Sequence, residues 1–515
     1  MPFTKATLVL SDYFPLLLDF LSYREDNPLI FTGWEFWLFF SLFLGGYALV
    51  YKRTEIKNPY ILLFSLFFYF KSSGWAVLLL LFTITQDFFL AKWMGKNQTG
   101  SGKKVLVSIS IVMNLLVLAY FKYAFLFADF LEMCFGIQIP HYNWLAAILP
   151  CKDLLQIHAD NILLPVGISF FIFHSLSYTI DVYRGIVNPL KSWVDYAVFV
   201  SFFPELVAGP IVRARDFTDQ LSAPFQSNRQ DFGKAIGLIL GGLFKKIVIS
   251  DMLSTGLADK VFEQPELASG IEAWFAVTAY AFQIFCDFSG YTDIAIGLAL
   301  VLGYHLKPNF NEPYKALSIT DFWRRWHISL SVWLRDYLYI PLGGNRKGKA
   351  MTYVNLLITM LLGGLWHGAS LKFILWGGLH GSALALHKGW QGFQKKAPIK
   401  IPDWIAGFLT FWFVVFCWIP FRAADLNTSF SLFQKLWVPW NFEILAGVIH
   451  AFSTPLSILG LAILLHYLPW KAKEFYFEVC GKVPVWVLGV FCFCMLVFMF
   501  QFSTEDSRPF IYFQF

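Results

Sequence analysis

Long apolar runs, separated by short polar or basic segments, dominate the pattern of this chain. Several runs are shorter than the roughly 20 residues that a helix needs to cross a hydrocarbon core, so tilted or re-entrant helices are expected among them. The pattern predicts an all-α, polytopic membrane protein. The runs cover residues 34–51, 60–70, 75–93, 105–127, 162–180, 196–212, 235–249, 273–302, 351–365, 371–386, 404–420, 455–468 and 485–500.

Composition supports a bilayer as the solvent. The 515 residues are 57% hydrophobic and 14% charged, whereas soluble domains carry roughly 25% charged residues. The net charge of +6 comes from basic residues dispersed in loops, as topology requires, and does not indicate nucleic-acid binding. We predict one helical membrane domain over residues 29–515. Residues 1–28 mix apolar and acidic side chains without signal-peptide features, and we expect an interfacial or amphipathic extension there.

The basic loops predict an orientation. Lysines and arginines at 52–57 and at 92–104 flank two apolar runs, and placing both groups in the cytoplasm puts the 71–74 turn outside. The acidic stretch 128–161 and both termini then lie outside as well. Cys134 and Cys151 fall in that stretch, where a disulfide could form. The 7 cysteines show no metal-binding spacing, so no metal site is expected.

His367 is the leading candidate for chemistry. It stands between the runs 351–365 and 371–386, which basic clusters at 346–349 and 388–400 bracket. The first run would give about 22 Å of helix, which places His367 at a turn within the membrane, near its middle or outer third. An ionisable side chain is expensive there and points to function. The alternative is a histidine satisfied by a backbone carbonyl at a helix break.

A second candidate lies around His327, in a segment rich in tryptophan and arginine. On one continuous helix, His327 would share a face with Arg324, three residues before it, and with Ser331, four residues after it. Arg324, Arg325 and Trp326 suit two roles. They could anchor the chain at the membrane interface, or they could hold a phosphate-bearing or pantetheine-bearing donor at the cytoplasmic mouth of a tunnel.

Polar side chains also follow helical spacing within two other runs. His174, Tyr178 and Asp181 line one face, and Asp287 and Tyr291 line another. Polar faces on membrane helices turn toward the protein interior or a wet cavity. Structural hydrogen bonds between helices are favoured here over catalysis.

Several blocks of the sequence resemble the membrane-bound O-acyltransferases, in the bacterial branch that O-acetylates alginate and D-alanylates teichoic acids. The likeness covers roughly residues 29–515, and it implies a helical fold with a water-accessible tunnel or funnel. It implies that His367 is the catalytic histidine and His327 the second histidine of the signature. His174 departs from the pattern, because a glutamine is expected there. The resembling blocks are 167–185, 203–211, 287–291, 323–344, 364–369, 421–423 and 512–515.

We therefore hypothesise acyl transfer, most simply of acetyl, from a cytoplasmic thioester to an extracytoplasmic hydroxyl. His367 would be the general base. His327 would be the second catalytic residue, and the substrates would contact Arg324, Arg325, Trp326, Trp366 and Ser331. No tightly bound cofactor is expected. The donor would be acetyl-CoA or an acyl carrier thioester.

The resemblance further implies a bacterial cytoplasmic (inner) membrane protein that works with a periplasmic acetyltransferase relay protein and an exopolysaccharide, beside membrane lipid. Two alternatives stay open. One is D-alanyl transfer to teichoic acid, and the other is a transporter that breaks no bonds. The sequence shows no repeat halves with paired broken helices, which transporter folds often carry.

Overall fold

The protein is described here by a computed structural model that covers residues 20–25, 27–96, 100–148, 162–397, 400–502 and 510–511. Every regular element in these ranges is a helix, which confirms the predicted all-α class. Five helical segments of the described residues are long and apolar enough to span a membrane, and a sixth would be the pair 445–451 and 453–467, bent by 82°. The chain is thus a multi-pass membrane protein.

Contacts within the chain define two compact units. The first comprises residues 1–117 and 140–206, and the second comprises 118–139 and 207–515. The chain therefore enters the second unit briefly at Leu118, long before it returns there at Val207. The domain boundary predicted at residue 28 stays a prediction.

The described helices of the first unit follow the predicted apolar runs closely. Gly74 adopts a positive φ of 58° and separates α3 from α4, in the turn predicted at 71–74. Lys71 is nevertheless buried and donates hydrogen bonds to the carbonyls of Phe20 and Ser22, at 2.9 and 2.6 Å. The helices are α2 (Trp34–Val50), α3 (Thr54–Ser73), η1 (Gly74–Ala76), α4 (Val77–Lys96), α5 (Gly100–Leu118), α7 (Trp144–Ile148), α8 (Ile168–Tyr183), α9 (Trp193–Ser201) and α10 (Phe203–Leu206).

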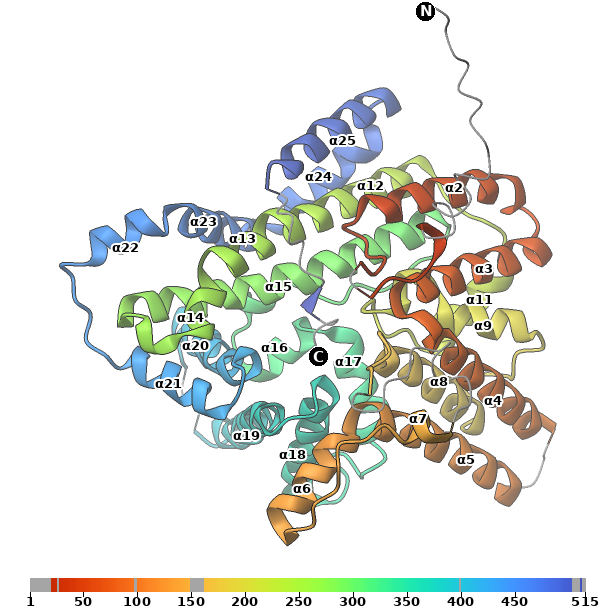
Figure 1. Cartoon of the computed structure of the whole chain (residues 1–515), viewed down its shortest axis with the longest axis horizontal. Helices are drawn as coiled ribbons and strands as arrows, with labels where there is room; N and C mark the ends of the chain where they lie inside the picture. Colours follow the sequence, from red (N-terminus) through yellow and green to blue (C-terminus); the bar gives the residue numbers. More distant parts are fainter. Residues whose placement is uncertain are drawn as a thin grey trace, which may run out of the picture. The chain divides into compact units, whose positions relative to one another are not determined.

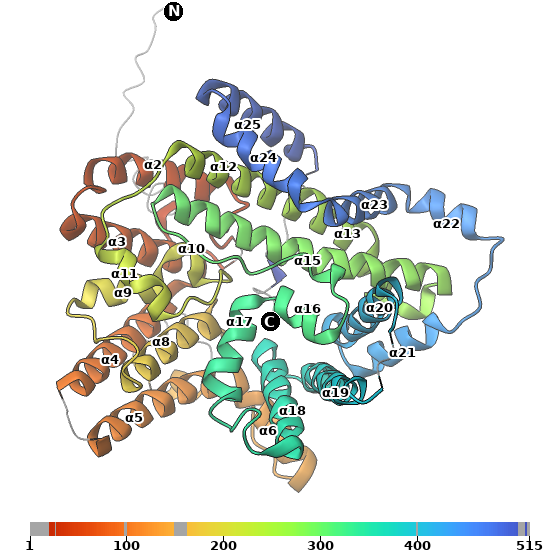
Figure 2. The ribbon, with the colours of Figure 1, turned by 180° about the vertical axis from the view of Figure 1, so that it is seen from behind.

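The second unit consists of the short segment 118–139 and of the chain from residue 207 onward. Its first elements are η2 (Ala119–Tyr123), α6 (Ala124–Phe135), α11 (Ala214–Ser222), α12 (Arg229–Phe244), η3 (Lys245–Ser250), α13 (Asp251–Leu253), η4 (Ser254–Ala258), α14 (Asp259–Glu263), η5 (Pro265–Leu267) and α15 (Gly270–Val301). α12 and α15 lie side by side, as both ribbon views show (Figure 1, Figure 2).

The remaining helices carry the candidate site and the C-terminal part of this unit. They are η6 (Pro313–Lys315), α16 (Ile319–Arg325), α17 (Ile328–Leu334), η7 (Arg335–Tyr339), α18 (Gly348–His367), α19 (Leu371–Gln394), α20 (Asp403–Arg422), α21 (Leu426–Leu436), α22 (Leu445–Ala451), α23 (Ser453–Tyr467), α24 (Trp470–Lys482) and α25 (Val485–Phe500). Two predicted runs are broken. The run 196–212 divides into α9 and α10, and the run 105–127 is interrupted by the π-helix η2.

α18 and α19 form the hairpin that presents His367. Glycines let the two backbones approach closely, as is common for membrane helices. A Cβ atom on Gly364 would lie 2.1 Å from the carbonyl oxygen of Phe373, and one on Gly377 would lie 2.3 Å from that of Met360. The sequence predicted a short run at 351–365, and this is corrected: α18 has 20 residues, or about 30 Å, because it starts three residues earlier and ends two residues later.

We expect Gly364→Ala to destabilise this hairpin, since the added methyl group overlaps the backbone of α19. Overpacking of this kind typically costs about 1–3 kcal/mol. Gly378→Ala is the matched control, because its Cβ would meet only a side-chain carbon of Leu361, at 3.6 Å. Thermal unfolding of the purified variants measures the difference. Equal melting temperatures for the two variants would contradict close backbone contact at Gly364.

Candidate active site

His367 is the last residue of α18, and aromatic side chains surround its ring. The ring centroids of Trp366, Trp376 and Phe421 lie 5.0, 5.0 and 5.2 Å from that of His367. His367 is 4% exposed. The chain then turns at 368–370 before α19 begins, which confirms the predicted turn between two helices. A methyl group on Gly368 would collide with the ring of Phe373, so this turn needs glycine.

His327 does not lie within a continuous helix, and the predicted helical face is wrong. α16 ends at Arg325, and His327 adopts the left-handed conformation (φ 42°, ψ 56°) immediately before α17. This conformation is uncommon for a residue other than glycine and is often held at functional sites. The three- and four-residue spacings to Arg324 and Ser331 therefore do not define a shared face.

Asn309 supplies the physical reason for the break. Its carbonyl accepts the amide hydrogen of Ile328 at 2.9 Å, and its side-chain Oδ1 accepts from the backbone and the hydroxyl of Ser329, at 3.0 and 2.9 Å. A remote residue thus caps the start of α17. Nδ1 of His327 lies 3.3 Å from the same Oδ1. Because that oxygen accepts, the contact assigns the ring proton to Nδ1.

The predicted blocks at 323–344 and 364–369 do meet. The His327 ring centroid lies 5.9 Å from that of Trp366, which in turn lies 5.0 Å from that of His367. The ring of Phe288 also packs nearly perpendicular to that of His327, with the centroids 4.7 Å apart. The two histidines, predicted from separate motifs, therefore belong to one buried aromatic cluster within the second unit.

The other predicted contact residues are divided between this cluster and the surface. Trp326 and Trp366 are buried in it, and Trp326 packs 4.8 Å from Trp418. Arg324 is exposed, and Arg325 forms an ion pair with Asp321 at 3.0 Å. The hydroxyl of Ser331 donates to the carbonyl of Trp326 at 3.3 Å. The structure thus brings Trp326 and Trp366 to the histidines and leaves Arg324 exposed.

Sequence reasoning missed His380 and Trp376, both on α19. The ring of Trp376 lies between two imidazoles, 5.0 Å from that of His367 and 4.7 Å from that of His380. His380 is fully buried, with Trp323 5.2 Å away. The signal was available, because Trp376 and His380 are four residues apart and so share a helical face.

Asp287 and Tyr178, one from each of the predicted polar faces, make hydrogen bonds within the fold, and the structural role of the two faces as a whole stays a prediction. Asp287 accepts from the ammonium of Lys246 at 2.7 Å and from the amide of Ile511 at 2.8 Å. In the first unit, the hydroxyl of Tyr178 accepts from the amide of Leu190 at 2.8 Å. Lys246 was not predicted as a partner, although it stands next to Lys245 in the predicted run 235–249. Cys151 lies outside the described residues, so the predicted disulfide stays untested.

A cluster of alternating charges lies next to α17. The guanidinium of Arg213 pairs with Asp216 at 2.7 Å and with Asp336 at 2.9 Å, and Lys307 also pairs with Asp216, at 2.6 Å. Burial opposes ionisation of Asp216, but hydrogen bonds from Lys307 and Arg213 outweigh it and hold the pKa of that carboxyl below its usual value. With Arg215 and Arg335 the cluster has an excess of positive charge.

A small cavity of about 80 Å³ opens beside this cluster and is lined by Arg213, Lys307 and Ser329, among others. Such a volume admits a few water molecules or one small anionic group. Within the described residues, no group of three or more histidine, cysteine, aspartate or glutamate side chains is placed to hold a metal ion.

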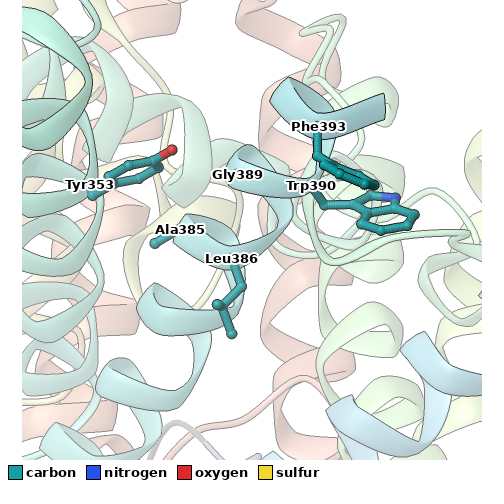
Figure 3. Close-up of a pocket in the computed structure, with 6 residues that line it drawn as sticks. All are labelled: Tyr353, Ala385, Leu386, Gly389, Trp390 and Phe393. Atoms are coloured by element: carbon teal, nitrogen blue, oxygen red, sulfur yellow. The ribbon is translucent and has the colours of Figure 1, made fainter. Parts of the chain in front are cut away.

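A larger hollow lies at the other end of the α18–α19 hairpin. Its space is about 550 Å³, and its walls are almost entirely apolar. Tyr353 stands 14 residues before His367 on α18, or about 21 Å along the helix, so this hollow is remote from the histidines. It is lined by Tyr353, Ala385, Leu386, Gly389, Trp390 and Phe393 (Figure 3).

Comparison with known proteins decides the family. The family described as "MBOAT, membrane-bound O-acyltransferase family" matches residues 190–430, which include both histidine blocks. A relative named "Probable alginate O-acetylase AlgI" from Pseudomonas putida is 36% identical over 507 residues, covering 93% of this chain and 98% of its own. The chain belongs to the membrane-bound O-acyltransferase family.

Two further relatives agree with this membership. The protein of the same name from Azotobacter vinelandii is 40% identical over 406 residues, or 78% of this chain and 76% of its own. A "Peptidoglycan O-acetyltransferase" from Helicobacter pylori is 36% identical over 426 residues, or 76% of each chain. As a member of this family, the chain is an O-acyltransferase, and the transporter alternative is not supported.

Proposed function

We propose that this O-acyltransferase moves acetyl from a cytoplasmic thioester to a hydroxyl group of an extracytoplasmic polysaccharide, directly or through a relay protein. The observation that carries the proposal is the burial of His367 and His327 in one aromatic cluster, in a chain whose relatives named above are alginate or peptidoglycan O-acetylation proteins by name. Acetyl is favoured over D-alanyl on the same grounds.

His367 acts as the general base in this proposal. A neutral imidazole has a lone pair on one ring nitrogen and can accept a proton. The acceptor hydroxyl loses its proton to His367 while its oxygen attacks the thioester carbonyl. The new C–O ester bond forms, the C–S bond breaks, and the imidazolium returns the proton to the departing thiolate. The products are an acetyl ester and a free thiol.

His327 positions a substrate beside His367. Its contact with Asn309 leaves the proton on Nδ1, so Nε2 is the basic nitrogen. Trp326 and Trp366 supply flat apolar walls, and Arg324 and Arg325 directly precede Trp326 at the end of α16. Acetyl is a small acyl group, which suits a histidine surrounded by several large rings.

The donor is proposed to be acetyl-CoA or an acyl carrier thioester, both of which carry phosphate. The excess of positive charge around Arg213, Arg215 and Lys307 suits such an anion, and the adjacent cavity reaches Ser329, two residues from His327. We further propose that the protein resides in the bacterial cytoplasmic membrane and works with a periplasmic acetyltransferase relay protein.

We propose alginate, which the names of two of the relatives contain, as the acceptor polysaccharide, and complementation tests it. A Pseudomonas strain that makes alginate but lacks its own alginate O-acetylase would carry this chain, and O-acetyl groups on the secreted polymer would be counted by proton NMR. We expect acetylation to return. Unacetylated alginate beside acetylated peptidoglycan, or D-alanyl esters on an envelope polymer, would overturn the alginate assignment.

A further inference from the structure

The end of α18 is held by a segment more than 240 residues away in sequence. The ammonium of Lys122 donates hydrogen bonds to the carbonyls of Trp366 and His367, at 2.6 and 3.2 Å, across 244 and 245 residues. The hydroxyl of the neighbouring Tyr123 donates to the carbonyl of Leu365 at 2.7 Å. Two consecutive side chains therefore donate hydrogen bonds to three consecutive carbonyls.

These carbonyls need partners from outside α18. The last four carbonyls of an α-helix have no amide donor within the helix, and in many helices a glycine in the left-handed conformation turns the chain back so that later amides bond to them. Here Gly368 continues in extended backbone instead (φ −167°, ψ 153°), and the chain leaves the helix directly. A positive charge at a helix C-terminus also interacts favourably with the helix dipole.

Lys122 and Tyr123 lie in the π-helix η2, within the segment 118–139 that makes its contacts with the second unit. π-Helical turns are rare and often mark functional sites. The ammonium also lies 6.0 Å from the ring centroid of Trp366, within the range of a cation–π contact. Both ribbon views place the neighbouring helix α6 beside α18 (Figure 1, Figure 2).

We propose that Lys122 and Tyr123 are positioning residues that fix the last turn of α18 and thereby the His367 imidazole. This inference rests on the proposed role of His367 as the base. These bonds reach only backbone carbonyls of residues 365–367. The two side chains therefore determine where the imidazole lies, and the imidazole itself stays the proton acceptor. We call the hydrogen bonds from Lys122 and Tyr123 to these carbonyls the clamp. Without the clamp, the last turn of α18 frays and the reacting nitrogen of His367 moves.

Steady-state kinetics of the full chain in membrane vesicles separate positioning from general stability. The probe is [¹⁴C]acetyl-CoA with alginate oligosaccharide. For Lys122→Met we expect kcat to fall about 10- to 100-fold, since a displacement of about 1 Å can cost that much, while KM stays within about twofold. Tyr123→Phe removes one bond and is expected to lower kcat about three- to tenfold. Lys122→Arg, which keeps the charge, should recover kcat to within about tenfold.

Two substitutions serve as matched controls. Lys71→Met removes another buried lysine that donates to two carbonyls, in the first unit. Tyr476→Phe removes a tyrosine hydroxyl that donates to the carbonyl of Gly237 at 3.1 Å. Both are expected to keep kcat near that of the native chain. A wild-type kcat in Lys122→Met and Tyr123→Phe, or an equal loss in the controls, would overturn the proposal.

A cryo-EM map distinguishes failure of the clamp from failure of the proposed base. In Lys122→Met, or in Tyr123→Phe if the first variant does not fold, the last turn of α18 should be displaced or poorly ordered. If the last turn of α18 is unchanged in these variants, the clamp does not position it, and this result does not depend on the role of His367. If the His367→Ala variant is fully active, His367 is not the general base, and this result does not depend on the map.

Discussion

Replacement of His367 with alanine is expected to lower acetyl transfer by about 10²- to 10⁴-fold, the range typical of losing a general base. The imidazole is the only group of the α18–α19 turn, residues 367–370, that can take a proton from a hydroxyl near neutral pH. Binding of the donor should change little, because the proton is transferred only in the transition state. The measurement is labelled acetyl ester formed per enzyme in membrane vesicles.

The control for this variant is His450→Ala. His450 is an exposed histidine on α22, outside the aromatic cluster, and its removal should leave the rate unchanged. Both variants must be inserted and present in equal amounts, as judged by immunoblot. Acetylation by His367→Ala at the native rate would contradict the assignment of the base.

The second large effect concerns the ion cluster between η3, α13 and α15. Lys246 contacts Asp251 at 2.8 Å and Asp287 at 2.7 Å, and the side chains of Lys246 and Asp287 are only 2% and 5% exposed. Asp287→Ala leaves the buried ammonium with one partner and the amide of Ile511 without its acceptor. Removing one member of a buried pair typically costs about 3–5 kcal/mol.

Asp293→Ala is the matched control on the same helix. Lys245 pairs with Asp293 at 2.6 Å, but these side chains are 31% and 25% exposed, and such pairs contribute about 0–1 kcal/mol. Thermal unfolding should therefore show a much lower melting temperature for Asp287→Ala than for Asp293→Ala. Similar melting temperatures would show that the buried cluster contributes no more than a surface pair.

The helices and the His367 turn were predictable because their signals are local. Apolar runs determine where helices lie, and glycines at 363, 364 and 368 mark the close approach and the turn around His367. The break at His327 was not predictable, since Asn309 causes it through bonds to Ile328 and Ser329. Spacing along one segment carries no information about a cap that comes from another.

Lys122 was missed for a similar reason. It stands within an apolar run, and its bonds reach residues 244 and 245 positions away. A lone lysine in such a run reads as a residue that extends to the membrane surface. Lys246, which stands beside Lys245 in the run 235–249, was overlooked as well. Long-range partners of intramembrane charges are decided by which helices pack together, and the sequence pattern does not specify that packing.

The most direct test of His367-dependent acetyl transfer measures both halves of the reaction at once. Membrane vesicles from the complemented Pseudomonas strain would receive [¹⁴C]acetyl-CoA, and free thiol and labelled polysaccharide would be counted together. We expect one ester for each thiol released, and about 10²- to 10⁴-fold less of both products with His367→Ala. Intact thioester with the native chain, or equal ester formation with His367→Ala, would contradict this account.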